Sequence, residues 1–271
     1  MDRDRLRQIW VTASEALCIY GTLLGVGVFG RRVEESSGGN LAADATLLAP
    51  ATTAFSIWSV IYLGLFAYTI WQWLPANRTS ARARATGWLA GVSMLLNAAW
   101  LLVTQVGLIW LSVGVIVALV VVLALLVKRL ADLPARDLTD RIVVDGTFGA
   151  YLGWVAVATA ANVTAAGVSS GWTLGALADQ VLAFGVLGVA AAIGVLLAKT
   201  VGARLALAGA MVWGLSWIAV GRLTGLPAST LVGVGALAAA AVVAIATLLV
   251  RQGRPKSPAP AERLAQSTST M

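Results

Sequence analysis

The sequence predicts an all-α integral membrane protein with eight transmembrane helices, and two observations carry this prediction. First, 59% of the 271 residues are apolar and the mean hydropathy is +0.86, whereas only 11% are charged; a typical soluble domain has roughly 25% charged residues. Second, the apolar residues form long runs without charges, and a helix needs about 20 such residues to cross a bilayer. Continuous runs of this length exclude a β-barrel, whose strands alternate apolar and polar residues.

The charge-free runs predict the position of each helix. The first helix is expected at about residues 9–29 and the second at about 53–74. Residues 85–127 contain no charge, and at roughly 1.5 Å per residue they are too long for one span. We therefore expect two helices there, with a turn near residues 104–107. Four further helices are expected at about residues 141–164, 173–198, 202–221 and 229–250.

The distribution of Lys and Arg predicts the orientation. If the N-terminus is cytoplasmic, the inner loops and both ends hold sixteen of the nineteen basic residues, and the outer loops hold only Arg31, Arg32 and Arg222. Because cytoplasmic loops are enriched in Lys and Arg, both termini are predicted to be cytoplasmic. We expect a multi-pass protein of the plasma (inner) membrane. Residues 251–271, which are rich in Pro, Ser and Thr, are expected to form a disordered cytoplasmic tail.

The composition also excludes several kinds of chemistry. The chain has no histidine and one cysteine, Cys18, which removes imidazole ligands, disulfides and thiolate clusters. No metal site, covalent cofactor or catalytic residue is predicted, and no convergent acid–base set indicates an enzyme. The net charge of +7 is explained by membrane orientation, so the expected partner is the lipid bilayer and no nucleic acid is expected.

Eleven tryptophans are an unusual number for this chain. Six lie near predicted helix ends, where indoles anchor helices at the membrane interface: Trp10, Trp71, Trp73, Trp88, Trp110 and Trp172. The other five lie within predicted spans, where an indole N–H needs a hydrogen-bond partner: Trp58, Trp100, Trp154, Trp213 and Trp217.

Three predicted helices carry an aromatic side chain together with Tyr or Asn at helical spacing. These pairs share one helix face, and their polar tips favour a position inside the bundle. The pattern predicts an aromatic-walled cavity for a planar hydrophobic molecule, although helix packing with interhelical hydrogen bonds is an alternative. The residues are Trp58, Tyr62, Asn97, Trp100, Tyr151, Trp154 and Asn162.

Two other patterns keep alternative functions open. Glu15 and Asp179 are carboxylates within predicted spans, which is a feature of secondary transporters. Four Gly-x-x-x-Gly pairs predict close helix contacts, within the chain or in a homodimer, and are compatible with a structural membrane subunit. These pairs are Gly21/Gly25, Gly87/Gly91, Gly149/Gly153 and Gly221/Gly225. At the fifth helix, Arg141 and Asp145 are expected to form a surface pair.

Three sequence motifs resemble those of a known family. A proline at residue 50 precedes the Trp58-x-x-x-Tyr62 spacing, residues 96–100 read Leu-Asn-Ala-Ala-Trp, and residues 151–154 read Tyr-Leu-Gly-Trp with an Asn at 162. In order and spacing they resemble the second, third and fifth helices of the tryptophan-rich sensory protein, or translocator protein (TspO, peripheral benzodiazepine receptor), family. The resemblance covers about residues 10–168.

The resemblance implies a five-helix bundle at residues 1–168, followed by a three-helix extension at residues 169–250. It also implies a ligand pocket near the loop after the first helix, lined by the seven residues above, that binds porphyrins, haem, sterols or synthetic aromatic compounds. The implied role is that of a sensor, receptor or translocator linked to tetrapyrroles. Without histidine, binding should tolerate a metal-free porphyrin.

The sequence departs from the family pattern at several positions. Residues 52–54 lack the tryptophan expected after the loop proline, and Ala150 replaces a proline. Val163 stands where the sterol-recognition pattern needs tyrosine, and no basic residue follows before Lys199. Sterol binding through that pattern is therefore not expected.

Overall fold

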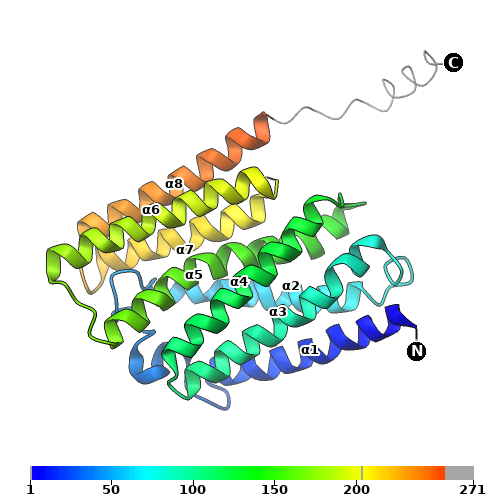
Figure 1. The fold of residues 1–271 in the computed structure, drawn as a ribbon, viewed down its shortest axis with the longest axis horizontal. Coiled ribbons are helices and arrows are strands. Elements are labelled where there is room, and N and C mark those ends of the chain that lie inside the picture. Colours follow the sequence, from blue (N-terminus) through cyan, green and yellow to red (C-terminus); the bar gives the residue numbers. More distant parts are fainter. Residues whose placement is uncertain (1, 203, 254–271) are drawn as a thin grey trace.

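The computed structural model describes residues 2–202 and 204–253, and within these residues the protein is all-helical (Figure 1). Short 3-10 segments occupy the loop after the first helix (η1, Val33–Glu35; η2, Ser37–Gly39) and precede the second (η3, Thr52–Ser56). A π-helical turn, η4 (Asp140–Gly146), precedes the fifth. The eight long helices are α1 (Arg3–Gly25), α2 (Ile57–Trp71), α3 (Ala81–Gln105), α4 (Ile109–Ala131), α5 (Thr147–Ser169), α6 (Ala176–Thr200), α7 (Leu205–Thr224) and α8 (Thr230–Gln252).

The predicted helices agree with the observed ones to within a few residues at most ends. The expected turn in the run 85–127 is confirmed, since α3 ends at Gln105 and α4 begins at Ile109. Gly107 provides the turn, with a φ of 77° that glycine adopts without strain. The expected tail at 251–271 is wrong in its first residues, because Arg251 and Gln252 belong to α8; residues 254–271 lie outside the described residues.

Seven of these helices are long and apolar enough to cross a membrane, and α1 is the exception. The polar residues of α1 include Arg7, Gln8, Ser14 and Glu15, all of which are buried in the bundle. α1 begins and α8 ends toward the same end of the bundle (Figure 1). A multi-pass membrane protein is thus supported, whereas eight crossings and cytoplasmic termini stay predictions.

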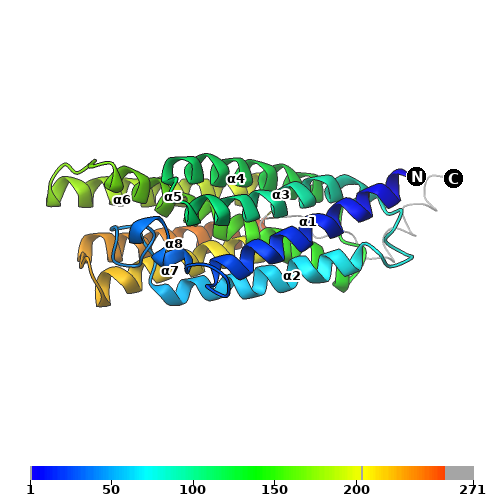
Figure 2. The same ribbon diagram turned by 90° about the horizontal axis from the view of Figure 1, so that it is seen from below.

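The helices form a flattened bundle in which α5 is central. α5 contacts α2, α4 and α7; α3 packs on α1 and α4; and α8 packs on α6 and α7. Seen from below, α3 and α4 lie on one side and α2 and α7 on the other (Figure 2). One cluster of buried apolar side chains runs from α1 to α8. The predicted five-helix and three-helix parts therefore share a core, and their separation into domains stays a prediction.

Glycines allow several of these helices to approach closely. A Cβ on Gly21 would lie 3.0 Å from the Cα of Ala98, where α1 crosses α3. A Cβ on Gly149 would lie 3.3 Å from the backbone nitrogen of Leu207, where α5 meets α7. The prediction that Gly-x-x-x-Gly pairs mark close helix contacts is confirmed at these positions. A homodimer through such faces stays a prediction.

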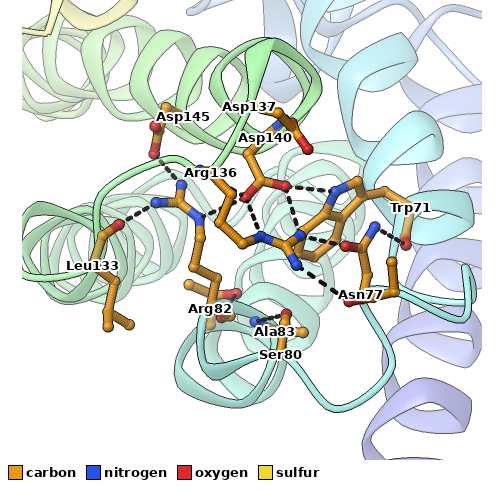
Figure 3. A network of polar contacts seen from close by, with 12 residues as sticks. Trp71, Asn77, Ser80, Arg82, Ala83, Leu133, Arg136, Asp137, Asp140 and Asp145 are labelled. Atoms are coloured by element: carbon orange, nitrogen blue, oxygen red, sulfur yellow. Dashed lines mark hydrogen bonds and ion pairs between the residues drawn. The ribbon is translucent and has the colours of Figure 1, made fainter. Parts of the chain in front are cut away.

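At the end of the bundle where α1 begins, a buried carboxylate joins three segments (Figure 3). Asp140 is fully buried and accepts hydrogen bonds from Trp71 Nε1 (3.0 Å) and Arg136 Nε (2.8 Å). Arg82 Nε lies 3.7 Å from the same carboxylate. The prediction that Trp71 is an interface anchor is therefore wrong: its indole is buried because it donates to Asp140.

Asp145 extends this network to α7. Its carboxylate pairs with Arg82 Nη2 (2.6 Å) and with Arg204 Nη1 (2.8 Å). The predicted surface pair of Asp145 with Arg141 is wrong, because the π-helical turn changes the register of the residues that precede α5.

The hydrogen bond to Asp140 also raises the pKa of Arg136, so that this side chain keeps its charge.

Candidate functional site

An open groove lies between α1, the loop that follows it and the start of α2. Its volume is about 400 Å³. The floor is aromatic: the rings of Trp58 and Tyr62 are stacked with centroids 5.2 Å apart and planes inclined by 14°. Arg32 and Glu34 line the rim, with Arg32 Nη1 3.8 Å from Glu34 Oε1. The groove thus combines a flat apolar floor with charges at one edge.

The sequence explains why Trp58 and Tyr62 form this floor. They are four residues apart at the start of α2 and so lie on one helix face. Trp58 is held from behind by two rings of α5: it meets Tyr151 at 5.9 Å and Trp154 at 6.2 Å, both nearly edge to face. Aromatic pairs in this geometry are favourable, so α5 fixes the orientation of the groove floor.

Two small cavities lie deeper in the bundle. One, of about 40 Å³, is lined by residues of the loop after α1 together with Trp100, Trp154 and Asn162. The other, of about 20 Å³, includes Asn97, Trp100 and Trp154 in its lining. Neither has room for a ring system. Phe55 lines the groove and both inner cavities, so its side chain separates the outer space from the inner ones.

Most polar groups around the inner cavities are engaged in interhelical hydrogen bonds. Asn97 Nδ2 donates to Tyr62 Oη (3.1 Å), which joins α3 to α2. Trp100 and Asn162 are bonded to each other across α3 and α5. Among the described residues, Trp154 Nε1 and Asn97 Oδ1 are buried without a partner. Both side chains line the 20 Å³ cavity. Buried polar atoms without partners are uncommon in folded proteins.

The structure brings all seven predicted site residues into one region. Trp58 and Tyr62 line the groove, and Asn97, Trp100, Trp154 and Asn162 line the inner cavities. Tyr151 contacts Trp58 and donates to the backbone oxygen of Ser93 at 3.3 Å. Their role in ligand binding stays a prediction.

The two predicted intramembrane carboxylates lie on different helices, Glu15 on α1 and Asp179 on α6. Glu15 is one helical turn from Cys18, whose Sγ lies 3.5 Å from Asn97 Nδ2, so it borders this region. Glu15 is 3% exposed, and its Oε2 has no hydrogen-bond partner among the described residues. Asp179 lies in the first turn of α6 and accepts a hydrogen bond from the backbone nitrogen of Leu174 (2.9 Å), which joins the helix to the residues that precede it. Among the described residues, no group of three or more potential metal-ligating side chains comes together.

Sequence reasoning missed two sets of residues that shape the site. Phe55 is three residues before Trp58, and this helical spacing was a signal that could have included it. No helical spacing marks the second set. It consists of the loop residues between 40 and 50 that cover the inner cavity and the α7 residues that contact this loop. Trp213 donates to the carbonyl of Ala54, and Arg222 to that of Thr46, across more than 150 residues.

The fold and the site together define a multi-pass membrane protein with an aromatic groove beside the loop that follows its first helix. The chain belongs to the TSPO-like protein family, which it matches over residues 12–249. The match includes α6, α7 and nearly all of α8, so it does not divide the chain into a family bundle and an extension. No curated protein and no solved structure matches the chain.

Proposed function

We propose that this protein binds a planar hydrophobic, tetrapyrrole-like molecule in its aromatic groove and acts as a sensor or translocator. It does so as an eight-span protein of the plasma (inner) membrane with both termini in the cytoplasm. The observation that carries the proposal is the stacked pair of Trp58 and Tyr62 on the groove floor. The groove volume of about 400 Å³ is within the range of small-molecule sites, roughly 300–1,000 Å³.

The chemistry of the groove supports a ligand with an aromatic face and an acidic edge. A flat ring can stack on the indole of Trp58, and such contacts contribute about 0.5–1.5 kcal/mol beyond buried area. Arg32 at the rim can pair with a carboxylate, since guanidinium groups bind carboxylates through paired hydrogen bonds. Because the chain contains no histidine, a metal in the ligand would receive no imidazole, and a metal-free porphyrin should bind as well.

The proposal is tested by titrating protoporphyrin IX into the purified full chain in detergent and following tryptophan fluorescence. We expect saturable quenching for the wild type. In Trp58→Ala the Kd should rise about tenfold, which corresponds to roughly 1.4 kcal/mol. Trp110→Phe, which changes an indole that donates to Ser170 and does not line the groove, is the matched control. Absence of saturable quenching, or an unchanged Kd in Trp58→Ala, would contradict the proposal.

One observation favours a second function, proton-coupled transport. The carboxylate of Glu15 is buried in the bundle with an oxygen that has no partner, and such groups are candidates for proton carriers. The test uses proteoliposomes that contain a pH-sensitive dye. If adding protoporphyrin IX changes the internal pH in the wild type but not in Glu15→Gln, the transport function is supported. If both proteins behave alike, Glu15 carries no proton.

A further inference from the structure

An irregular segment covers the inner cavity. Between α1 and α2 the chain forms only 3-10 turns and bends. The cavity lining includes, from this stretch, Asn40, Leu41, Thr46, Ala49, Pro50 and Phe55. We call residues 43–54 the cover segment. Its own hydrogen bonds are short turn contacts, such as Ala49 nitrogen to Thr46 oxygen at 3.3 Å, so its position depends on the elements against which it packs.

A buried cation of α7 holds one end of the cover segment. Arg222 is 1% exposed. Its Nη1 donates to the carbonyl oxygen of Thr46 (2.8 Å) and its Nη2 to that of Ala43 (2.7 Å). No carboxylate of the described residues lies within ion-pair distance of this guanidinium. A buried charge needs hydrogen-bond partners; the backbone of the cover segment supplies two, and the carbonyl oxygen of Leu226 supplies a third (2.9 Å).

Two further hydrogen bonds join α7 to the other end of the segment. Trp213 Nε1 donates to the carbonyl oxygen of Ala54 (2.9 Å), and the backbone nitrogen of Ala51 donates to the carbonyl oxygen of Trp217 (3.1 Å). One turn beyond Trp217, Gly221 lets α7 and the cover segment approach closely, since a Cβ there would lie 3.3 Å from the Ala51 nitrogen.

The cover segment is bonded to α7 and, where it runs into α2, to the first residue of that helix. Within the part of the chain that the structure describes, the carbonyl of Ala54 accepts from the backbone nitrogen of Ile57, and the hydrogen bonds between residues 43–54 and a long helix distant in the chain go to Arg222, Trp213 or Trp217. The helices that line the cavity from the opposite side, α3 and α5, make none. Holding the cover in place is therefore a task of the C-terminal half of the chain.

We propose that α7 keeps the cover segment closed over the inner cavity, and that Arg222 and Trp213 are positioning residues that set how readily the cover opens and makes room for a ligand between the groove and the inner cavity. This inference rests on the proposed function of the groove. Phe55, which separates the groove from both inner cavities, directly follows Ala54. The carbonyl of Ala54 accepts from Trp213 and from the backbone nitrogen of Ile57, so loss of the Trp213 N–H removes the side-chain bond that joins this turn to α7.

The first test measures access to the inner cavity without any ligand. In a Cys18→Ser background, Ala165→Cys places a thiol in the cavity lining, at a position that is 3% exposed. The rate of labelling by a membrane-permeant maleimide is then compared with and without Trp213→Phe, which keeps an aromatic ring and removes the N–H. Because this variant loses the hydrogen bond that joins Ala54 to α7, the labelling rate should rise about tenfold.

The control is Trp110→Phe, which removes a similar indole hydrogen bond to Ser170 (2.8 Å) that does not involve the cover segment; its labelling rate should not change. Arg222→Gln should raise the rate further. If Arg222→Gln does not yield a folded protein by gel filtration, the labelling rates of Trp213→Phe and Arg222→Lys test the proposal without it. Unchanged labelling in the folded variants overturns the proposal.

A second test separates this inference from the proposed function. In stopped-flow mixing with protoporphyrin IX, Trp213→Phe should increase the association rate several-fold, whereas Trp110→Phe should not. Faster labelling in a protein that does not bind protoporphyrin IX would support the α7 contact and refute the groove function. Saturable binding together with unchanged labelling and association rates would leave the groove function standing and refute the role of α7.

Discussion

Trp100 Nε1 on α3 donates a 2.7 Å hydrogen bond to Asn162 Oδ1 on α5. Asn162 Nδ2 in turn donates to Ser112 Oγ on α4 at 3.0 Å. All three side chains are buried, so one indole, one amide and one hydroxyl connect three helices beside the inner cavity. Two residues expected to contact a ligand therefore also hold the bundle together, and substituting them should affect both stability and binding.

We predict that Trp100 and Asn162 are energetically coupled. Asn162→Ala leaves the indole N–H without its partner, while the Ser112 hydroxyl still donates to the carbonyl of Ile109 (2.6 Å); the loss should cost about 1–3 kcal/mol. In a double-mutant cycle with Trp100→Phe, measured by thermal unfolding in detergent, the double variant should lose less than the sum of the single ones. Simple additivity would show that the hydrogen bond contributes little.

Asp140 should be essential for stability at the opposite end of the bundle. Its carboxylate is bound by Arg136 and Trp71 and lies near Arg82, so Asp140→Asn removes the negative charge that faces Arg136 and the buried Trp71 indole, while Arg82 keeps its ion pair with Asp145. Because Arg136 is 42% exposed, the loss of this acceptor should cost about 1–3 kcal/mol, the range for a buried donor such as the Trp71 indole that loses its partner. The matched control is Asp132→Asn, an exposed carboxylate, which should leave the Tm unchanged. Equal Tm values for the two variants would contradict this role of Asp140.

The stabilising effect of Asp4 should depend on pH. The hydrogen bond from Arg84 lowers the pKa of Asp4 below its ordinary value of about 3.8, and Arg7 adds to this effect. A carboxyl with a lowered pKa contributes stability that is present above the ordinary pKa and lost as the pH falls through the lowered one. The Tm difference between the wild type and Asp4→Asn should therefore be constant from pH 7 to 5 and shrink below pH 4, with about 3.8 as the upper bound of the transition.

The control for this pH profile is Asp2→Asn. Asp2 is mostly exposed and its Oδ2 lies 3.7 Å from Arg78, and asparagine can replace it as the helix cap. This variant should have nearly the wild-type Tm at every pH. If the Tm difference between the wild type and Asp4→Asn persists unchanged down to pH 3, the charge of Asp4 is not the cause of its stabilising effect.

The contact between α5 and α7 should depend on the absence of a side chain at Gly153. A Cβ there would collide with the backbone oxygen of Leu207 and lie 3.1 Å from the Cβ of Ala210. Gly153→Ala should therefore lower the Tm, because two backbones must separate. Gly185→Ala on α6, where a Cβ meets nothing within 4 Å, is the control and should gain up to about 1 kcal/mol from helix propensity. The reverse order of Tm values would refute this account of the contact.

The helices and much of the candidate site could be predicted from local patterns. A charge-free run of given length forms a helix in a bilayer because its backbone has no other hydrogen-bond partners, so spans such as α4 follow from residue order. Helical spacing placed Trp58 with Tyr62 on one face, and the structure stacks their rings. The end positions were less exact: the π-helical turn before α5 gave Asp145 different partners from those expected.

What the sequence by itself determined is the set of apolar helices, their order and the aromatic face that three of them share, because these depend on periodicities within single segments. Tertiary structure alone decided that Trp71 is buried against Asp140, that Phe55 separates the groove from the inner cavities, and that Arg222 holds the cover segment. The partners in these contacts come from distant parts of the chain or are backbone carbonyls, and a carbonyl leaves no mark in the sequence. Only the packing of α7 against the loop shows that the carbonyls of Ala43 and Thr46 accept hydrogen bonds from a buried arginine.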